Sequence, residues 1–198
     1  MWSFRAVVAA AGLCVDLLAG QVANASLIGQ SVTVTLTDGG SLFHDDVVTV
    51  GSGVELAPGD GSDIGTLLLP SERIDIGATS ILLTLEEGVP GGGTGYPSGT
   101  AYAFTNLAFF GEATAITGVT LTASNITGIS LGDLSFTATS LRVPIDVLRI
   151  GDIPGVDTGT LEIDLTFAAV PEPQTAVLAS LGLLALAWRV RRLRRSAA

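Results

Sequence analysis

The sequence contains no lysine, and only one histidine and one cysteine, among its 198 residues. The lack of lysine excludes a Walker-type phosphate loop and a Schiff-base enzyme, because both depend on the ammonium group of that residue. One cysteine and one histidine cannot supply the ligands of the usual Cys/His zinc site, nor can they build a disulfide framework. Charged residues make up only 14% of the chain. The composition thus removes several classes of enzyme and metalloprotein from consideration.

The charges that are present are distributed unevenly. Residues 26–170 hold three Arg against seventeen Asp and Glu, a net charge of −14, whereas residues 171–198 hold five Arg against one Glu, a net charge of +4. An acidic central region repels phosphate groups, so we expect no nucleic-acid partner. The basic residues at the end of the chain are confined to a short run, which indicates a topological signal rather than a binding surface.

The first 25 residues are typical of a secretory signal peptide. Arg5 supplies the positive charge, and residues 6–19 form the apolar stretch. Ala23 and Ala25 are the two small residues of the expected cleavage site, and Ser26 is the expected first residue of the mature protein. Asp16 is an exception within this stretch, because a carboxylate opposes membrane insertion. An uncleaved N-terminal anchor is the alternative to a signal peptide. If cleavage occurs, Cys14 leaves with the signal peptide and the mature protein has no thiol.

Residues 170–198 combine three features in a fixed order: a Pro-Glu-Pro motif, an apolar run and an arginine cluster. Pro171 and Pro173, on either side of Glu172, make the first part extended, because each proline fixes φ and removes a backbone donor. A helix over residues 175–188 reaches roughly 20 Å and comes close to crossing the ~30 Å hydrocarbon core when its flanking arginines snorkel. Five arginines would then hold the C-terminus in the cytoplasm: Arg189, Arg191, Arg192, Arg194 and Arg195.

This order of features resembles a PEP-CTERM sorting tail, and the resemblance covers about residues 170–195. It implies recognition by an exosortase, a membrane transpeptidase-like enzyme that acts near the Pro-Glu-Pro motif. It also implies export through the secretion machinery of a Gram-negative bacterium, transient contact with the inner membrane, and sorting to the cell surface or an exopolysaccharide-rich matrix. A plain single-pass anchor with a positive stop-transfer signal is the alternative.

The region between the two terminal signals has the pattern of β-strands. Residues 31–37 alternate strictly, with Val32, Val34 and Leu36 on one face and threonines on the other. Short strands separated by Gly, Asp and Asn predict an all-β fold, an antiparallel β-sandwich that is jelly-roll-like. Further strands are expected near residues 47–50, 64–69, 73–76, 81–85, 101–109, 119–124 and 160–167.

Two segments depart from regular strands. Leu134 and Phe136 share one face, but Leu141 has the opposite parity, which predicts a bulge or bend near Ser140. The glycine-rich segment 88–99 lacks apolar anchors, so we expect a mobile loop there.

Asp60 and Asp63 lie in a glycine-flanked loop and are the candidate ligands of a Ca²⁺ site. Calcium takes six to eight oxygen ligands, which carboxylates, hydroxyls and carbonyls of such loops supply. The loop lacks the full acidic pattern and the closing Glu of an EF-hand, so a solvated acidic turn is the alternative. We expect no other cofactor.

Three other patterns have simple structural explanations. His44, Asp45 and Asp46 would suit a metal or a general base, but an exposed hairpin corner also explains them. Residues 128–132 fit the G-x-S-x-G pattern of serine hydrolases, yet no helix follows Ser130 and the single histidine precedes it, so we expect a turn. Alternating threonines would form a hydroxyl ladder for ice or glycans, but threonine is also common on the wet face of strands.

We therefore expect a non-enzymatic exported protein with a signal peptide at 1–25, a β-sandwich domain at 26–169 and a sorting tail at 170–198. Its role would be structural, adhesive or associated with polysaccharide. The alternative is a secreted carbohydrate-active or hydrolytic enzyme on the same scaffold. Two carboxylate pairs are available for it, but neighbours on a strand point to opposite faces and make poor acid–base couples: Asp45 with Asp46, and Glu86 with Glu87.

Overall fold

A computed structural model describes residues 26–88, 92–108, 114–151, 155–169 and 182–183. These residues form strands and two single-turn 3-10 helices, and every strand pairing is antiparallel, which confirms the all-β prediction. The elements are β1 (Ser31–Asp38), β2 (Ser41–Thr49), η1 (Ile64–Thr66), β3 (Arg73–Ile76), β4 (Ser80–Glu86), β5 (Ala101–Thr105), β6 (Thr114–Ser124), β7 (Ile126–Thr127), η2 (Leu131–Asp133), β8 (Ser135–Phe136), β9 (Ser140–Pro144), β10 (Arg149–Ile150) and β11 (Thr158–Ala169).

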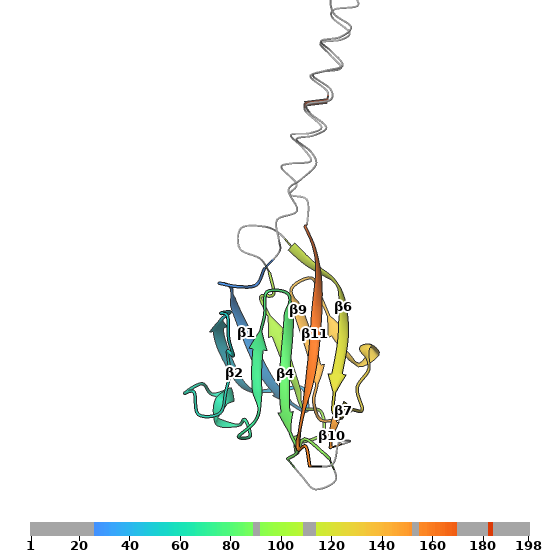
Figure 1. Ribbon diagram of the computed structural model, residues 1–198. Coiled ribbons are helices and arrows are strands. Elements are labelled where there is room, and N and C mark those ends of the chain that lie inside the picture. Colours follow the sequence, from blue (N-terminus) through green and yellow to red (C-terminus); the bar gives the residue numbers. More distant parts are fainter. Residues whose placement is uncertain (1–25, 89–91, 109–113, 152–154, 170–181, 184–198) are drawn as a thin grey trace, which may run out of the picture.

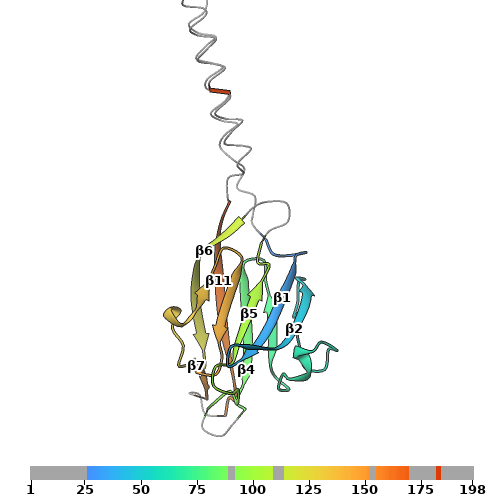
Figure 2. The ribbon, with the colours of Figure 1, turned by 180° about the vertical axis from the view of Figure 1, so that it is seen from behind.

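The strands belong to two larger sheets and one small one. The five-stranded sheet has the order β2-β1-β5-β9-β8, the four-stranded sheet has the order β3-β4-β11-β6, and β10 pairs with β7. Figure 1 shows the four-stranded sheet in front, and the view from behind in Figure 2 brings β1, β2 and β5 forward. The two larger sheets therefore lie one behind the other.

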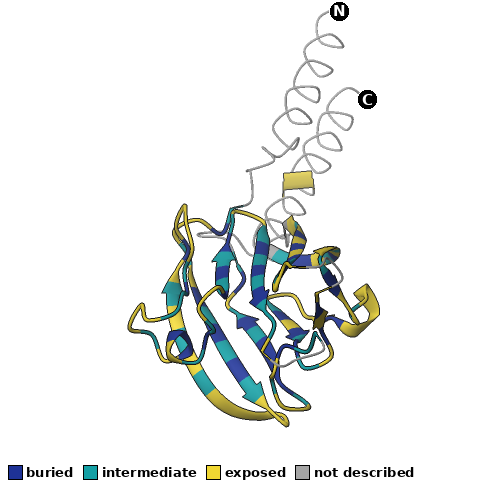
Figure 3. Cartoon of the chain, turned by 60° about the horizontal axis from the view of Figure 1, so that its bottom comes forward, coloured by how far each residue is buried: buried dark blue, intermediate teal, exposed yellow. Residues whose placement is uncertain are grey.

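Alternation of apolar and polar residues produces the core between the sheets. Val34 of β1 and Phe104 of β5 belong to the same cluster of buried side chains as Leu83 of β4 and Ile163 of β11, and all four are fully buried. Successive side chains on a strand point to opposite faces, so each strand contributes every second residue to this core. Figure 3 shows the result as buried segments that alternate with partly buried and exposed ones along the strands.

The prediction of a strand over residues 64–69 is wrong, because this apolar run forms η1 and a turn. The Asp46 carboxylate of β2 accepts hydrogen bonds from the backbone N–H groups of Asp63 (3.1 Å) and Ile64 (2.7 Å), which holds the start of η1 against the sheet. Ile64 and Leu68 are buried, although they lie outside any strand. A short apolar run signals burial, but its periodicity alone does not distinguish a strand from a buried turn.

The parity change near Ser140 arises from a hairpin rather than a bulge. β8 and β9 pair with each other, with Phe136 opposite Leu141. The Thr137 N–H donates to the Ser140 carbonyl at 2.9 Å, and the two hydroxyl oxygens lie 2.6 Å apart. The chain reverses in this tight turn, so the residues that share one face change parity without an insertion; Leu141 of this pair is buried, whereas Phe136 on the edge strand β8 is 41% exposed. β5 is also shorter than the strand expected over residues 101–109.

The start of the described chain and the end of β11 lie at one end of the domain, whereas β7 and β10 lie at the other (Figure 1). The Leu27 N–H donates to the Ala78 carbonyl at 2.7 Å in the turn between β3 and β4, and the Leu165 N–H donates to Thr79 in the same turn. The last residues of β11 continue toward the predicted sorting tail. The end with β10 thus lies opposite the end of β11, the last strand before the tail.

Replacing Ile163 with Ala should lower the free energy of unfolding by about 2–5 kcal/mol, because it leaves a cavity in the core. Ile163 is fully buried on β11 between Ile81 of β4 and Leu121 of β6. Glu162→Ala, on the exposed face of the same strand, is the matched control and should change the value by no more than about 0.5 kcal/mol. Urea denaturation measures both; similar losses in the two variants would contradict a core between the sheets.

Candidate functional site

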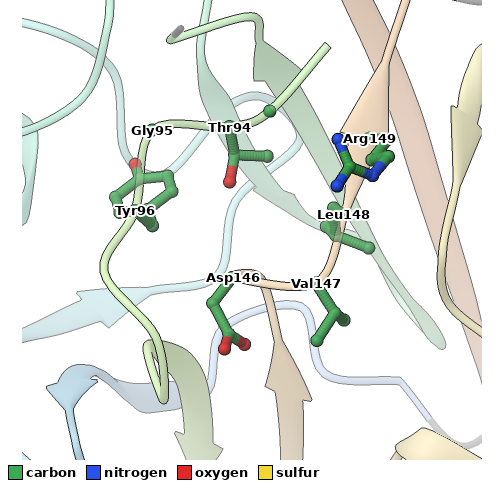
Figure 4. A pocket seen from close by; sticks show the side chains of 8 residues that line it. Thr94, Gly95, Tyr96, Asp146, Val147, Leu148 and Arg149 are labelled. Carbon is green, nitrogen blue, oxygen red and sulfur yellow. The ribbon is translucent and has the colours of Figure 1, made fainter. Parts of the chain in front are cut away.

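A cleft with a volume of about 540 Å³ lies at the end of the domain that contains β10. Two chain segments form its walls, residues 93–96 and residues 146–149 (Figure 4), and we call it the distal cleft. Its volume lies within the range of small-molecule sites, roughly 300–1,000 Å³. The lining residues are Gly93, Thr94, Gly95, Tyr96, Asp146, Val147, Leu148 and Arg149.

Hydrogen bonds fasten the two walls of the distal cleft to each other. The buried Thr94 hydroxyl donates to the Ile145 carbonyl at 3.0 Å, and the Ile150 N–H donates to the Gly92 carbonyl at 2.5 Å. Gly92 has φ +87°, and a Cβ there would lie 2.3 Å from the Ile150 carbonyl oxygen, so only glycine fits. Thr94 and Tyr96 thus anchor the described part of the glycine-rich segment through hydrogen bonds of their hydroxyl groups. The lack of apolar anchors does not leave this part as the mobile loop that the sequence predicts, because polar side chains hold it instead.

One carboxylate and one guanidinium supply the charge in the distal cleft. Asp146 accepts a hydrogen bond from the Gly99 N–H at 2.7 Å through Oδ2. Arg149 is exposed, and its guanidinium makes no hydrogen bond or ion pair with any residue that the structure describes. Val147 adds an apolar side chain that is 45% exposed. The cleft therefore offers a carboxylate acceptor on Asp146, several N–H donors on Arg149 and an apolar side chain on Val147.

A buried carboxylate, Glu72, lies behind the Tyr96 wall of the distal cleft. Its side chain is fully buried, and its Oε2 accepts hydrogen bonds from the Tyr96 hydroxyl (2.8 Å) and the Leu69 N–H (2.9 Å). The Tyr96 hydroxyl also lies 3.4 Å from that of Tyr102. The neighbouring Arg73 donates to backbone carbonyls instead of this carboxylate.

Burial determines the protonation of this cluster. Loss of solvent raises the pKa of Glu72 above its ordinary value, and the bonds from Leu69 and Tyr96 only partly offset that effect. Burial also raises the pKa values of Tyr96 and Tyr102, so both hydroxyls stay protonated and can donate. Only the position of Glu72 between two apolar runs could have pointed to this cluster from the sequence.

The structure places Asp60 and Asp63, the candidate calcium ligands, in the loop before η1. Asp60 accepts hydrogen bonds from the Ala57 N–H (2.7 Å) and from the N–H (2.8 Å) and hydroxyl (2.5 Å) of Ser62. Partial burial opposes ionisation of Asp60, but the bonds from Ser62 and Ala57 outweigh it and lower its pKa. A Cβ on Gly65 would lie 2.2 Å from Asp60 Oδ1, so the turn closes tightly on this carboxylate. Asp60 is thus the hydrogen-bonded centre of a turn.

The residues of the other sequence patterns have structural roles in the fold. His44, Asp45 and Asp46 lie within β2 rather than at a hairpin corner, and the Asp46 carboxylate binds the start of η1. The expectation that no helix follows Ser130 is wrong in detail, because the single-turn 3-10 helix η2 starts at Leu131. The Ser130 hydroxyl donates to Asp133 at 2.7 Å and so caps this turn. Within the described ranges, no three His, Cys, Asp or Glu side chains are grouped so that they could hold a metal ion.

The paired carboxylates Glu86 and Glu87 bind different loops. Glu86 accepts from the Ser71 N–H at 2.7 Å, and Glu87 accepts from the Gly92 N–H at 2.8 Å. Both carboxylates therefore position backbone, and they do not converge on a common site.

Most residues of the two terminal signals lie outside the described residues. These include Ala23 and Ala25 of the cleavage site, the Pro171-Glu172-Pro173 motif and the whole arginine cluster. Ser26 is described, and its hydroxyl oxygen accepts a hydrogen bond from the Ile28 N–H at 3.2 Å. Of the predicted helix 175–188, only Gly182 and Leu183 are described; both are helical and exposed. In the part of the chain that is described, no helix has the length and apolar character needed to cross a membrane.

Comparison with protein families identifies the C-terminal segment. The model of the PEP-CTERM protein-sorting motif matches residues 169–192. The chain carries a PEP-CTERM sorting motif. The match confirms the resemblance seen at residues 170–195, and the motif implies an exported protein that is processed by an exosortase. No curated protein and no solved structure matches the chain.

Glu72→Gln should make the stability of the protein less dependent on pH. The pKa of Glu72 is raised in the folded state, so the folded protein keeps a proton that the unfolded chain loses above the ordinary value of 4.5. The associated stabilisation is complete below that value and is lost as the pH rises through the folded pKa. Urea denaturation at about pH 4 and about pH 8 should show that Glu72→Gln gains stability relative to the wild type at the higher pH. The exposed Glu162→Gln is the control, and an equal change in both variants would contradict the prediction.

Alanine substitutions separate the two interpretations of the Asp60 loop. A turn held by Asp60 predicts that Asp60→Ala lowers Tm equally with calcium or with a chelator, and that Asp63→Ala has little effect. Three lost hydrogen bonds, at about 0.5–1.5 kcal/mol each, set an upper scale for the loss in Asp60→Ala. A calcium site predicts that chelator lowers the Tm of the wild type and that both variants abolish this shift. Absence of a chelator effect in the wild type would contradict the calcium hypothesis.

Proposed function

We propose that this PEP-CTERM protein is a non-enzymatic β-sandwich that is displayed at the cell surface or in the extracellular matrix of a Gram-negative bacterium. Its role there is structural or adhesive, in association with polysaccharide. The sorting motif at residues 169–192 carries the proposal, because it implies export and exosortase processing. The shared core of the two larger sheets supports the sandwich architecture.

The position of the tail relative to the domain supports display. The sorting motif begins at the end of β11, and the predicted mature start at Ser26 belongs to the same end of the domain. While the predicted membrane segment at residues 175–188 holds the chain in the inner membrane, the opposite end of the domain is the end that lies away from the start of the tail. The distal cleft lies at that opposite end. A displayed domain of this shape presents its cleft to the surroundings.

The geometry of the carboxylates favours a non-enzymatic role over a glycosidase. Glycosidases use two carboxylates that face each other across the scissile bond at about 5–10 Å. Among the residues that line the distal cleft, Asp146 is the single carboxylate, and it is bonded to the Gly99 N–H. Glu86 and Glu87 bind separate loops. These observations support a binding or structural role for the domain.

Mass spectrometry of the protein from its native host tests processing. We expect a mature N-terminus at Ser26 and a surface form that lacks Arg194 and Arg195, because the exosortase acts near the Pro-Glu-Pro motif. A chain in which Pro171, Glu172 and Pro173 are replaced by alanine should stay in the inner membrane with both arginines attached. A host without its exosortase is the control and should give the same unprocessed form. Surface protein that still carries Arg194 and Arg195 would overturn the proposal.

A further inference from the structure

We propose that the distal cleft binds a neutral saccharide, and that Asp146 and Arg149 provide its main polar contacts. The inference deepens the proposed function, on which it rests, because it assigns the polysaccharide contact to one place on the domain. It follows from the shape of the cleft, from its unused polar groups and from the charge of the surrounding domain.

The cleft is held in shape before any ligand arrives. An antiparallel bridge joins Gly93 to Arg149, and the Thr94 hydroxyl joins the same wall to Ile145. Tyr96 is fixed from behind, since its hydroxyl donates to Glu72 and its ring packs edge-on against Tyr102 with centroids 6.5 Å apart. The walls of the cleft are therefore ordered in advance, and the entropy lost on binding is mainly that of the exposed Arg149 side chain.

The two charged side chains of the cleft retain free hydrogen-bonding capacity. Asp146 uses Oδ2 for the Gly99 N–H, whereas its Oδ1 accepts no hydrogen bond from the described residues. Arg149 has five N–H donors and uses none of them within the described part of the chain. A sugar hydroxyl is both a donor and an acceptor, so different hydroxyls along a saccharide can bond to Asp146 and to Arg149.

An apolar surface completes the recognition of a sugar ring. Val147 is 45% exposed at the cleft, and the Tyr96 ring forms part of the opposite wall (Figure 4). A pyranose has apolar C–H faces between its hydroxyls and packs against such groups. Binding sites for small molecules commonly combine these few polar groups with apolar walls.

The charge of the domain selects neutral saccharides over acidic ones. Residues 26–170 have a net charge of −14, so a polyanion approaches against the field of the whole domain. A cationic ligand would instead meet the guanidinium of Arg149 in the cleft. A neutral glycan avoids both penalties.

Saturation-transfer NMR with the full chain in mild detergent tests this site. The probes are three neutral hexasaccharides, from cellulose, starch and mannan, with an alginate hexasaccharide as the acidic comparison. We expect at least one neutral probe to bind in preference to alginate. Arg149→Met and Asp146→Asn should each weaken that binding about tenfold, the scale of one lost charge-assisted hydrogen bond. Arg142→Met is the matched control, because Arg142 is exposed on β9 outside the cleft, and it should bind like the wild type.

Thermal melting checks that all three variants remain folded. The inference is overturned by the absence of binding to any neutral probe, by preferential binding of alginate, or by equal affinity of folded Arg149→Met and wild type. A protein that is processed correctly in its host but binds no glycan would retain the proposed display and lose only this site. A chain that binds glycan but keeps Arg194 and Arg195 at the surface would retain the glycan site and overturn the proposed processing.

Discussion

Each of the two larger sheets hides one face from water by packing against the other, and this shared burial supports the rest of the domain. Fully buried side chains from both sheets, such as Phe104 and Ile163, meet in one cluster. If the chain is cleaved before Ser26, it retains no cysteine, so no disulfide can add to its stability. The apolar core must then offset the conformational entropy lost on folding.

The buried carboxylate of Glu72 connects this core with the distal cleft. Burying a charge is costly unless it is hydrogen-bonded, and Glu72 receives the Tyr96 hydroxyl and the Leu69 N–H. The same bond fixes Tyr96, which gives one wall of the cleft a rigid aromatic group. The buried Glu72 carboxylate thus holds Tyr96, and with it part of the glycine-rich segment, in a fixed position at the cleft. Burial raises the pKa of Glu72, so ionisation of this carboxyl group costs the folded protein more than it costs the unfolded chain.

The arrangement of the chain agrees with its sorting signal. The PEP-CTERM motif follows the last strand, β11, and the distal cleft lies at the other end of the domain. In the proposed function, the attached end faces the membrane during export and the free end faces the polysaccharide. The acidic surface helps to keep copies of the domain apart and disfavours polyanions.

The sequence by itself determined the sorting motif at residues 170–195 and the all-β class, because both are encoded in local order and in alternation of residue type. Strands such as 73–76 coincide with β3 for this reason. Only the tertiary structure decided that residues 64–66 form η1, that Glu72 is buried, and that residues 93–96 and 146–149 line one cleft. Each of these depends on contacts between segments distant in sequence, such as Asp46 with η1, and a local pattern cannot specify which distant partner satisfies a polar group.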